Sequence, residues 1–378
     1  MPTGARAAIC RGPEEPFAIE RVTLDELRSD ELLIRVVASG ICHTDLAVRD
    51  RQLPMPLPAV LGHEGAGIVE AVGEAVTVAQ PGDRVVMSFN SCGHCPSCTA
   101  DAPTYCYEFL QQNWIGTRPD GSFTLTADSG DTVNASFFGQ SSFATYAIAH
   151  QRNTVKIPED LADLPLERIA PIGCGLMTGA GAVLRSMAVR PGLPIVVTGA
   201  GTVGLAAIMA AKIVGAAPIV AIDVNHKRLA LARELGATHV FNAKDDPVGA
   251  VRQLCPAGLA YAFDTTGRAD VIQDLFGLLA PRGKLGIVGA SDPEAMLSFN
   301  ETQFMGGGRT VMGILGGDSD VDGFLIELLR HHAEGRFPFD RLIGYFDFDQ
   351  INEAIHASEA GDVVKPVLVM DKAAVAAE

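Results

Sequence analysis

The chain has 378 residues, of which 48% are hydrophobic and 20% are charged, as is typical of a globular protein with a large core. This length favours two or three domains. The 29 Lys and Arg residues against 45 Asp and Glu residues give a formal net charge of −16, which argues against nucleic-acid binding, because neutralising phosphates requires a positive surface.

The start of the chain, MPTGARAAICRGPEEP, lacks the apolar segment of a secretory signal. No uncharged apolar run reaches the roughly 18 residues of a membrane span. We therefore expect a cytoplasmic protein with no membrane association. The eight cysteines should then be reduced, which favours metal binding or catalysis over disulfides.

The first third of the chain predicts β-strands. Its short apolar runs are separated by Gly, Pro and Asp, as in ELLIRVVASGIC, GHEGAGIVEAVGEAV, PGDRVVMSF and FATYAIAHQRNTVKIP. From about Pro191 the pattern changes to apolar strands such as PIVVTGAG and PIVAIDV, which alternate with helical stretches such as VGLAAIMAAKIVGA. This alternation predicts βαβ units and a parallel sheet. After about Gly316 we expect helices and a final strand, VVKPVLVM.

Four cysteines lie close together in NSCGHCPSCTADAPTYC, with the spacing C-x₂-C-x₂-C-x₇-C. Four thiolates on one loop can close a tetrahedral shell around Zn²⁺, which is the pattern of a structural site. An iron–sulfur cluster is the main alternative, but its ligand run is tighter and is followed by a proline. We therefore predict structural zinc on Cys92, Cys95, Cys98 and Cys106.

A glycine motif, IVVTGAGTVG, follows an apolar strand and opens a helix, which is the context of a dinucleotide-binding turn. Its glycines, Gly199, Gly201 and Gly204, would allow a tight turn, close approach to a pyrophosphate and close helix packing. Thr202 and Val203 lie between the last two glycines and are predicted to contact the cofactor. The next strand ends in Asp223, whose carboxylate favours NAD over NADP, although Arg228 is close enough to hold a 2′-phosphate.

A second set of metal ligands is scattered over the strings GICHTD, GHEGAG and PIGCGLMTG. Cys42, His63 and Cys174 would form a Cys₂His set, which leaves the fourth position of a zinc ion for water or substrate. Asp45 could orient His63 through the second ring nitrogen. From spacing alone, three unrelated residues remain an alternative, since a buried cysteine behaves as a small hydrophobe.

In order and combination these motifs resemble the zinc-dependent medium-chain alcohol dehydrogenases over nearly the whole chain. The strings that carry the resemblance are GICHTD, LGHEGAGIVEAVG, PGDRVV, CGHCPSCTADAPTYC, GCGLMTGAGAV, VTGAGTVGLAAIMAAKIVGA and AIDVNHKRLALARELGAT. GICHTDLAVRD and RPDGSFTLT are most similar to the aryl-alcohol (benzyl-alcohol) and allylic-alcohol subgroups. The resemblance implies a GroES-like β-rich catalytic domain, residues 1–175 and 316–378, with an inserted doubly wound Rossmann domain, residues 176–315.

The resemblance also implies two zinc ions per subunit, one catalytic and one structural, and an NAD-binding homodimer or homotetramer. It places Thr44 beside the alcohol and Glu64 behind the metal. The residues that it implies for the cofactor are His43 and Lys365 at the pyrophosphate, Thr178 at the nicotinamide, Val288 at the carboxamide and Arg228 at the adenosine ribose.

One position departs from the pattern of many members. A histidine that ends their proton relay is replaced here by Ala47, so the relay must stop at Thr44 and the ribose hydroxyl, use another base, or pass the proton to water. Benzyl-type members are similar in this respect.

The expected reaction is the reversible oxidation of a primary aromatic or allylic alcohol. Phe89, Phe109 and Trp114 are candidates for pocket walls, and each could equally pack in a loop core. The alternatives are a zinc dehydrogenase for short aliphatic alcohols, polyols or S-hydroxymethyl-glutathione, and a non-catalytic nucleotide-binding protein. Cys10 and Cys255 have no assigned role.

Overall fold

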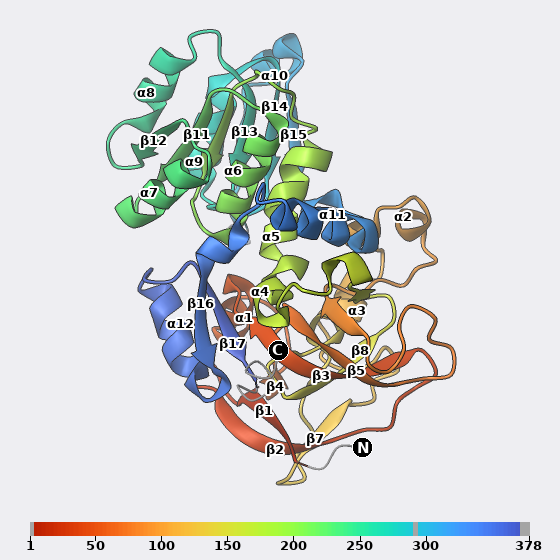
Figure 1. The fold of residues 1–378 in the computed structure, drawn as a ribbon. Helices are drawn as coiled ribbons and strands as arrows, with labels where there is room; N and C mark the ends of the chain where they lie inside the picture. The colour runs from red at the N-terminus through yellow and green to blue at the C-terminus, as the bar shows by residue number, and fades with distance from the viewer. Residues whose placement is uncertain (1–3, 290–293, 371–378) are drawn as a thin grey trace. The chain divides into compact units, whose positions relative to one another are not determined.

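The computed structural model describes residues 4–289 and 294–370. They divide into two compact units (Figure 1). The first contains the described residues up to Cys174 together with 320–333 and 340–370, and the second contains the described residues of 175–319 together with 334–339. None of the helices in these described residues combines the length and apolarity that a membrane crossing requires.

The first unit is built on two sheets. The larger has the strand order β16-β17-β3-β5-β6-β9, with β8 also paired to β3, and the smaller has the order β4-β1-β2-β7. The strands of the larger sheet are β3 (Glu31–Gly40), β5 (Gly65–Val72), β6 (Arg84–Met87), β8 (Tyr146–His150), β9 (Thr154–Lys156), β16 (Ile343–Asp347) and β17 (Lys365–Val369). Those of the smaller are β1 (Ala5–Cys10), β2 (Ala18–Leu24), β4 (Ala59–Val60) and β7 (Leu125–Ala127). The predicted β-rich first third is confirmed.

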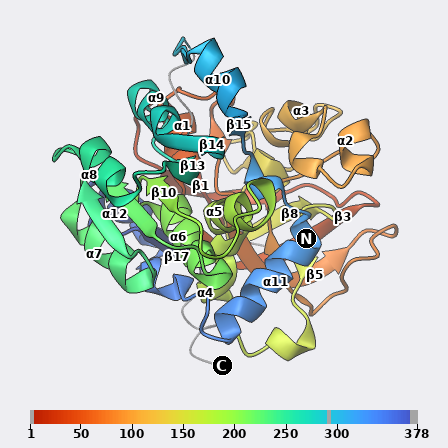
Figure 2. The same cartoon turned by 90° about the horizontal axis from the view of Figure 1, so that it is seen from above.

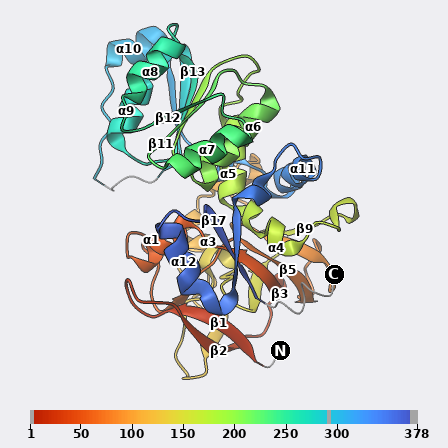
Figure 3. The same ribbon diagram turned by 60° about the vertical axis from the view of Figure 1, so that its left-hand side comes forward.

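Strand β3 is buried on both faces, which explains its continuous apolar sequence. Leu33 belongs to the core shared with the smaller sheet, whereas Leu32 and Ile34 pack on the opposite face, as the two-residue period of a strand requires. Strand β17, the last of the described strands, pairs antiparallel with β3, so segments from opposite halves of the chain meet in one sheet (Figures 1 and 3).

Short helices connect or cover these sheets. They are α1 (His43–Arg49), α2 (Pro96–Thr99), α3 (Phe109–Asn113), α4 (Leu166–Ile169), α11 (Val321–Ala333) and α12 (Ile351–Glu359), with short 3₁₀ segments that include η1 (Pro103–Tyr105), η2 (Phe137–Gly139) and η4 (Ala170–Gly173). The helices and the final strand that the sequence predicts after Gly316 are confirmed, and β16 lies between them.

The second unit is a doubly wound parallel sheet with the order β12-β11-β10-β13-β14-β15. The strands are β10 (Ile195–Thr198), β11 (Ile219–Asp223), β12 (His239–Asn242), β13 (Leu259–Asp264), β14 (Leu279–Ile287) and β15 (Thr310–Gly313). The helices are α5 (Gly175–Gly181), α6 (Thr202–Val214), α7 (His226–Leu235), α8 (Pro247–Leu254), α9 (Ala269–Leu278) and α10 (Glu301–Gly307). Helices α6 and α7 cover one face and α8 and α9 the other (Figures 2 and 3).

Strand β10 begins this sheet at its centre. All four of its residues are buried, as is typical of a parallel strand covered on both faces. The chain runs outward through β11 and β12, then crosses to β13, so the strand order reverses beside β10. In such sheets ligands bind at the carboxyl ends of the strands at this reversal point. The βαβ prediction is therefore confirmed, and it places Gly199 at the reversal point.

Candidate active site

Helix α1 begins directly after Cys42 and carries three predicted site residues, His43, Thr44 and Asp45, in its first turn. Cys42 is the N-cap, and its backbone N–H donates to the carboxylate of Asp45 at 2.8 Å. This reciprocal cap fixes the helix start and therefore the direction of the Cys42 thiol. Thr44 follows in the same turn, and its hydroxyl oxygen lies 3.6 Å from the Cys42 sulfur.

Two further segments bring His63 and Cys174 to this helix start. The His63 Nδ1 lies 3.0 Å from Asp45 Oδ1, and its Nε2 lies 3.2 Å from the Cys174 sulfur. The ligand atoms of Cys42, His63, Glu64 and Cys174 all lie within 4.8 Å of one another. Two thiols and one imidazole form a donor set that zinc prefers, and the fold assembles it from segments that are far apart in sequence.

The Asp45 carboxylate organises the imidazole of this cluster. Asp45 is fully buried, and its Oδ1 also accepts the backbone N–H of Gly62 at 3.0 Å. Burial lowers the pKa of His63, but Asp45 and then Cys42 raise it more, so that the pKa lies well above its ordinary value. The pKa of the Cys42 thiol is lowered well below its ordinary value, first by the hydrogen bond with Cys174 and then by His63. The cluster therefore favours a thiolate on Cys42, which is the ligand form of cysteine.

Glu64 of this cluster forms a buried ion pair with Lys365. The Lys365 ammonium donates to both carboxylate oxygens of Glu64 at 2.8 Å and to the carbonyl of Ile41 at 2.9 Å. Burial raises the pKa of the Glu64 carboxyl, and the Lys365 charge opposes this rise. In this structure Lys365 therefore holds Glu64, and its expected contact with a pyrophosphate stays a prediction.

Five aromatic residues form an aromatic cluster beside His63: Phe89, Phe109, Trp114, Phe137 and Phe138. The Phe138 ring stacks on the His63 imidazole with centroids 4.6 Å apart, and Phe137 meets it edge-on at 5.3 Å. The sequence pointed to Phe89, Phe109 and Trp114 but missed the two rings that touch His63. The only sequence feature that marks Phe137 and Phe138 is their adjacency in SFFGQ, and two adjacent phenylalanines are equally common in a buried core segment.

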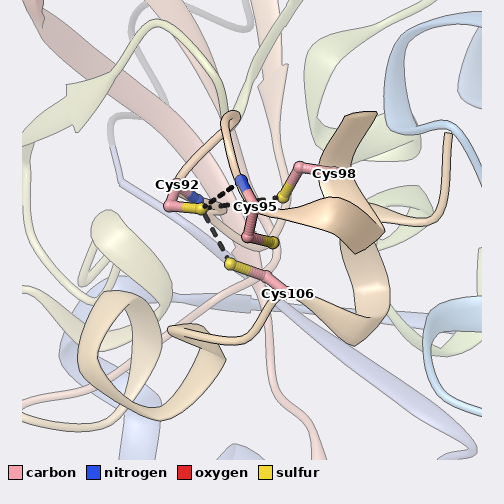
Figure 4. Close-up of side chains that lie close together, drawn as sticks. All are labelled: Cys92, Cys95, Cys98 and Cys106. Atoms are coloured by element: carbon pink, nitrogen blue, oxygen red, sulfur yellow. Dashed lines mark hydrogen bonds between the residues drawn. The ribbon is translucent and has the colours of Figure 1, made fainter. Parts of the chain in front are cut away.

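The four loop cysteines lie together as the spacing predicts. Their sulfurs all lie within 4.8 Å of one another, and Figure 4 shows them directed toward a common point. Backbone N–H groups of Cys92 and Cys95 donate to the sulfurs of Cys106 and Cys92 at 3.3 and 3.4 Å. All eight cysteines of the chain are free thiols in the structure. A set of four convergent sulfurs matches the donor set of a structural zinc site, in which four protein ligands fill the tetrahedral shell.

The glycine motif forms the turn between β10 and α6. Gly199 has φ +86°, a conformation that favours glycine, and a Cβ on Gly204 would lie 1.8 Å from the Gly199 carbonyl oxygen. By contrast, a Cβ on Gly201 would meet nothing within 4 Å, which leaves open space above the turn. Asp223 ends β11, and its carboxylate accepts the backbone N–H groups of Ala200 at 2.6 Å and Asn225 at 2.7 Å. This geometry is that of a dinucleotide-binding turn.

The remaining predicted cofactor residues are spread over several elements. Thr202 and Val203 start α6, Arg228 lies on α7, Thr178 on α5, and Val288 follows β14. His43 is exposed on α1. The contacts of these residues with a cofactor stay predictions.

Comparisons with known proteins agree on one family. Residues 28–159 match the alcohol dehydrogenase GroES-like domain, and residues 202–330 match the zinc-binding dehydrogenase domain. A geraniol dehydrogenase from Castellaniella defragrans is 45% identical, and the match covers 97% of each chain. The crystal structure of benzyl alcohol dehydrogenase from Acinetobacter calcoaceticus is 40% identical with a TM-score of 0.93, covering 98% of this chain and 100% of that one. An alcohol dehydrogenase zinc-binding domain protein from Burkholderia ambifaria is 45% identical with a TM-score of 0.95, covering 97% of this chain and 99% of that one.

Proposed function

The chain belongs to the zinc-dependent alcohol dehydrogenase family, and from this premise we propose that it interconverts primary aromatic or allylic alcohols and their aldehydes with NAD. The observation that carries this proposal is the convergence of Cys42, His63 and Cys174 beside Thr44. Relatives named for geraniol and for benzyl alcohol support the substrate class.

We assign two zinc ions to each subunit. Cys42, His63 and Cys174 would hold the catalytic ion, because three protein ligands leave one position open for substrate. Cys92, Cys95, Cys98 and Cys106 would hold a structural ion in a closed shell. When bound, the catalytic zinc would act as a Lewis acid toward the alcohol oxygen, and the nicotinamide would accept hydride.

The residues of the chain supply orientation and proton transfer. Thr44 Oγ1 would accept the hydroxyl proton of the substrate through a short hydrogen bond and pass it on. Asp45 keeps His63 in the tautomer that presents Nε2 to the metal, since Nδ1 is engaged by the carboxylate. Ala47 is buried and carries no titratable group, so the proton leaves Thr44 through the cofactor ribose, another base or water.

We propose NAD as the preferred cofactor. Asp223 is almost fully buried at the end of β11, and its carboxylate would bind the ribose hydroxyls and repel a 2′-phosphate. Arg228, five residues later, is the feature that opposes this preference. A homodimer or homotetramer is proposed for the assembly, and light scattering of the purified protein tests it.

The aromatic cluster is the structural support for the substrate class. Phe109, Trp114 and Phe138 are only partly buried although they pack on one another, so each of these residues retains some exposed surface. An apolar surface of this kind beside the metal ligands suits a planar, apolar alcohol better than a polyol, which requires more hydrogen-bonding groups.

The deciding experiment follows NADH formation from NAD⁺ with benzyl alcohol, geraniol, ethanol and sorbitol, before and after chelation, and NADH consumption with the corresponding aldehydes. We expect chelator-sensitive turnover that is fastest with benzyl alcohol or geraniol. Best activity with ethanol or sorbitol would retain the zinc mechanism and overturn the substrate class. Absence of turnover in both directions would favour a non-catalytic nucleotide-binding protein.

A further inference from the structure

The side chain of Asn113, the last residue of α3, forms two hydrogen bonds with the backbone of Asn90, an arrangement that we call the Asn113 clamp. Its Oδ1 accepts the Asn90 N–H at 2.8 Å, and its Nδ2 donates to the Asn90 carbonyl at 2.9 Å. The same Nδ2 also donates to the carbonyl of Phe109 at 2.8 Å. Asn113 is fully buried, so these bonds have no competition from water. The side chain therefore ties α3 to residues 88–91, the segment that leaves β6.

The segment 88–91 runs directly beside the metal-ligand segments. Ser88 Oγ donates to the carbonyl of Gly173, the residue before Cys174, at 2.6 Å. The amide of Gln140 donates to the carbonyls of Ser88 at 2.8 Å and of His63 at 3.0 Å. Ser88 is therefore held to the metal-ligand segments by bonds that do not involve Asn113.

Phe89 and Phe109, two rings of the aromatic cluster, lie in segments that Asn113 holds by hydrogen bonds. Phe89 directly precedes the clamped Asn90, and Phe109 has its carbonyl held by Asn113. Phe89 packs on Phe109 with centroids 5.9 Å apart, Phe109 on Phe138 at 6.2 Å, and Phe138 on His63 at 4.6 Å. A continuous series of ring contacts therefore leads from the segments held by Asn113 to His63, a predicted metal ligand.

We propose that Asn113 is a positioning residue that sets the aromatic cluster and, through it, the selectivity for planar alcohols over small ones. This inference rests on the proposed function. None of the hydrogen bonds described for Asn113 involves His63, Cys42 or Cys174, so its loss should leave the chemistry of a small alcohol intact. Displacement of the aromatic rings would instead raise the activation barrier only for substrates that pack against those rings.

The test compares Asn113→Ala and Asn113→Asp with Gln111→Ala, a control on the exposed face of the same helix. For Asn113→Ala we expect the ratio of kcat/KM for benzyl alcohol to kcat/KM for ethanol to fall about tenfold, mostly through KM, with zinc content unchanged. Asn113→Asp retains the acceptor for the Asn90 N–H but turns a carboxylate oxygen toward the carbonyls of Asn90 and Phe109, so a fall at least as large is expected. Gln111→Ala should retain the parental ratio.

Trp114, the single tryptophan of the chain, gives a readout that does not depend on turnover. It is the next residue after Asn113 and packs on Phe137 and Phe138 at 5.6 and 5.4 Å, so its emission should shift in Asn113→Ala and not in Gln111→Ala. A folded Asn113 variant with an unchanged ratio overturns the inference, whether or not its emission shifts, and if the alanine variant does not fold, the aspartate variant decides by the same measurement. An inactive parent protein would instead overturn the proposed function.

Discussion

Asp45 shows how one buried carboxylate organises the site at the scale of single residues. It joins the start of α1 to the His63 loop by bonds to the backbone N–H of Cys42 and Gly62 and to His63 Nδ1. We expect Asp45→Asn to lower zinc affinity and kcat/KM about 10- to 100-fold, because residues that orient a metal-bound histidine have effects of this size. Competition with a chromophoric chelator measures the affinity.

The matched control is Asp50→Asn at the other end of the same helix, where the carboxylate pairs with Arg49. This change removes one negative charge without touching His63, so zinc affinity should stay at the parental value. Equal losses in both variants would show that Asp45 acts only through the helix.

Lys365 and Glu64 offer a second test at this scale. Lys365→Met leaves the Glu64 carboxylate buried without its partner, and removing one member of a buried pair costs about 3–5 kcal/mol. The double variant Lys365→Met, Glu64→Gln should recover part of this loss, since no charge is then buried unpaired. Urea unfolding of the parent, both single variants and the double variant gives the coupling energy, and a coupling near zero would contradict the ion-pair role.

The sequence predicted two groups of metal-ligating side chains that the structure brings together, the four-cysteine loop from its spacing and the scattered Cys42, His63 and Cys174 set from the family resemblance. The four cysteines lie within one loop, and His63 follows a glycine in GHEGAG. The ion pair between Lys365 and Glu64 joins residues 301 positions apart, and the clamp of Asn113 on Asn90 joins buried amides with no recurring spacing. Such contacts depend on the packed fold, so no local pattern could predict them.

At the scale of elements, the glycines of the turn between β10 and α6 separate stability from cofactor binding. Gly204→Ala would put a Cβ 1.8 Å from the Gly199 carbonyl oxygen and force the backbone apart, at a cost of about 1–3 kcal/mol of stability. Gly201→Ala meets no protein atom within 4 Å, so stability should be unchanged. Because the second glycine lets the pyrophosphate approach the backbone, Gly201→Ala should weaken NADH binding by about tenfold or more.

Thermal unfolding and a fluorescence titration with NADH separate the two effects. If Gly201→Ala binds NADH as tightly as the parent protein, the pyrophosphate does not lie over this turn. If Gly204→Ala is as stable as the parent, the helix packs less tightly on the strand than the structure indicates.

Elements with a periodic apolar pattern were predicted well. The buried runs of β10 and β11 and the amphipathic tail helices follow directly from hydrophobic patterning. The short segment η2 was not predicted, because Phe138 adopts a φ of +51°, which is unusual for a large residue. Its carbonyl is held by the side chain of Asn153 at 2.9 Å, so tertiary contacts decide its conformation.

At the scale of the whole molecule, the four-cysteine loop is a lobe that buries too few side chains to be stabilised by packing alone. Between Cys92 and Cys106 the only buried residues are Cys95, Thr104 and Cys106, and helix α2 buries none. A segment with so little apolar burial requires a cross-link to stay folded, and a bound zinc would supply it.

Metal analysis and substitution of one ligand test this role. The parent protein should contain two zinc ions per subunit, and Cys98→Ser should contain one, with the free energy of unfolding lowered by about 2–5 kcal/mol. Cys255→Ser, at a thiol outside both clusters, should keep two zinc ions and parental stability. Because α3 and its Asn113 clamp directly follow this lobe, loosening it should also lower activity on benzyl alcohol more than on ethanol. A Cys98→Ser protein with one zinc and parental stability would show instead that the loop is held by the protein alone.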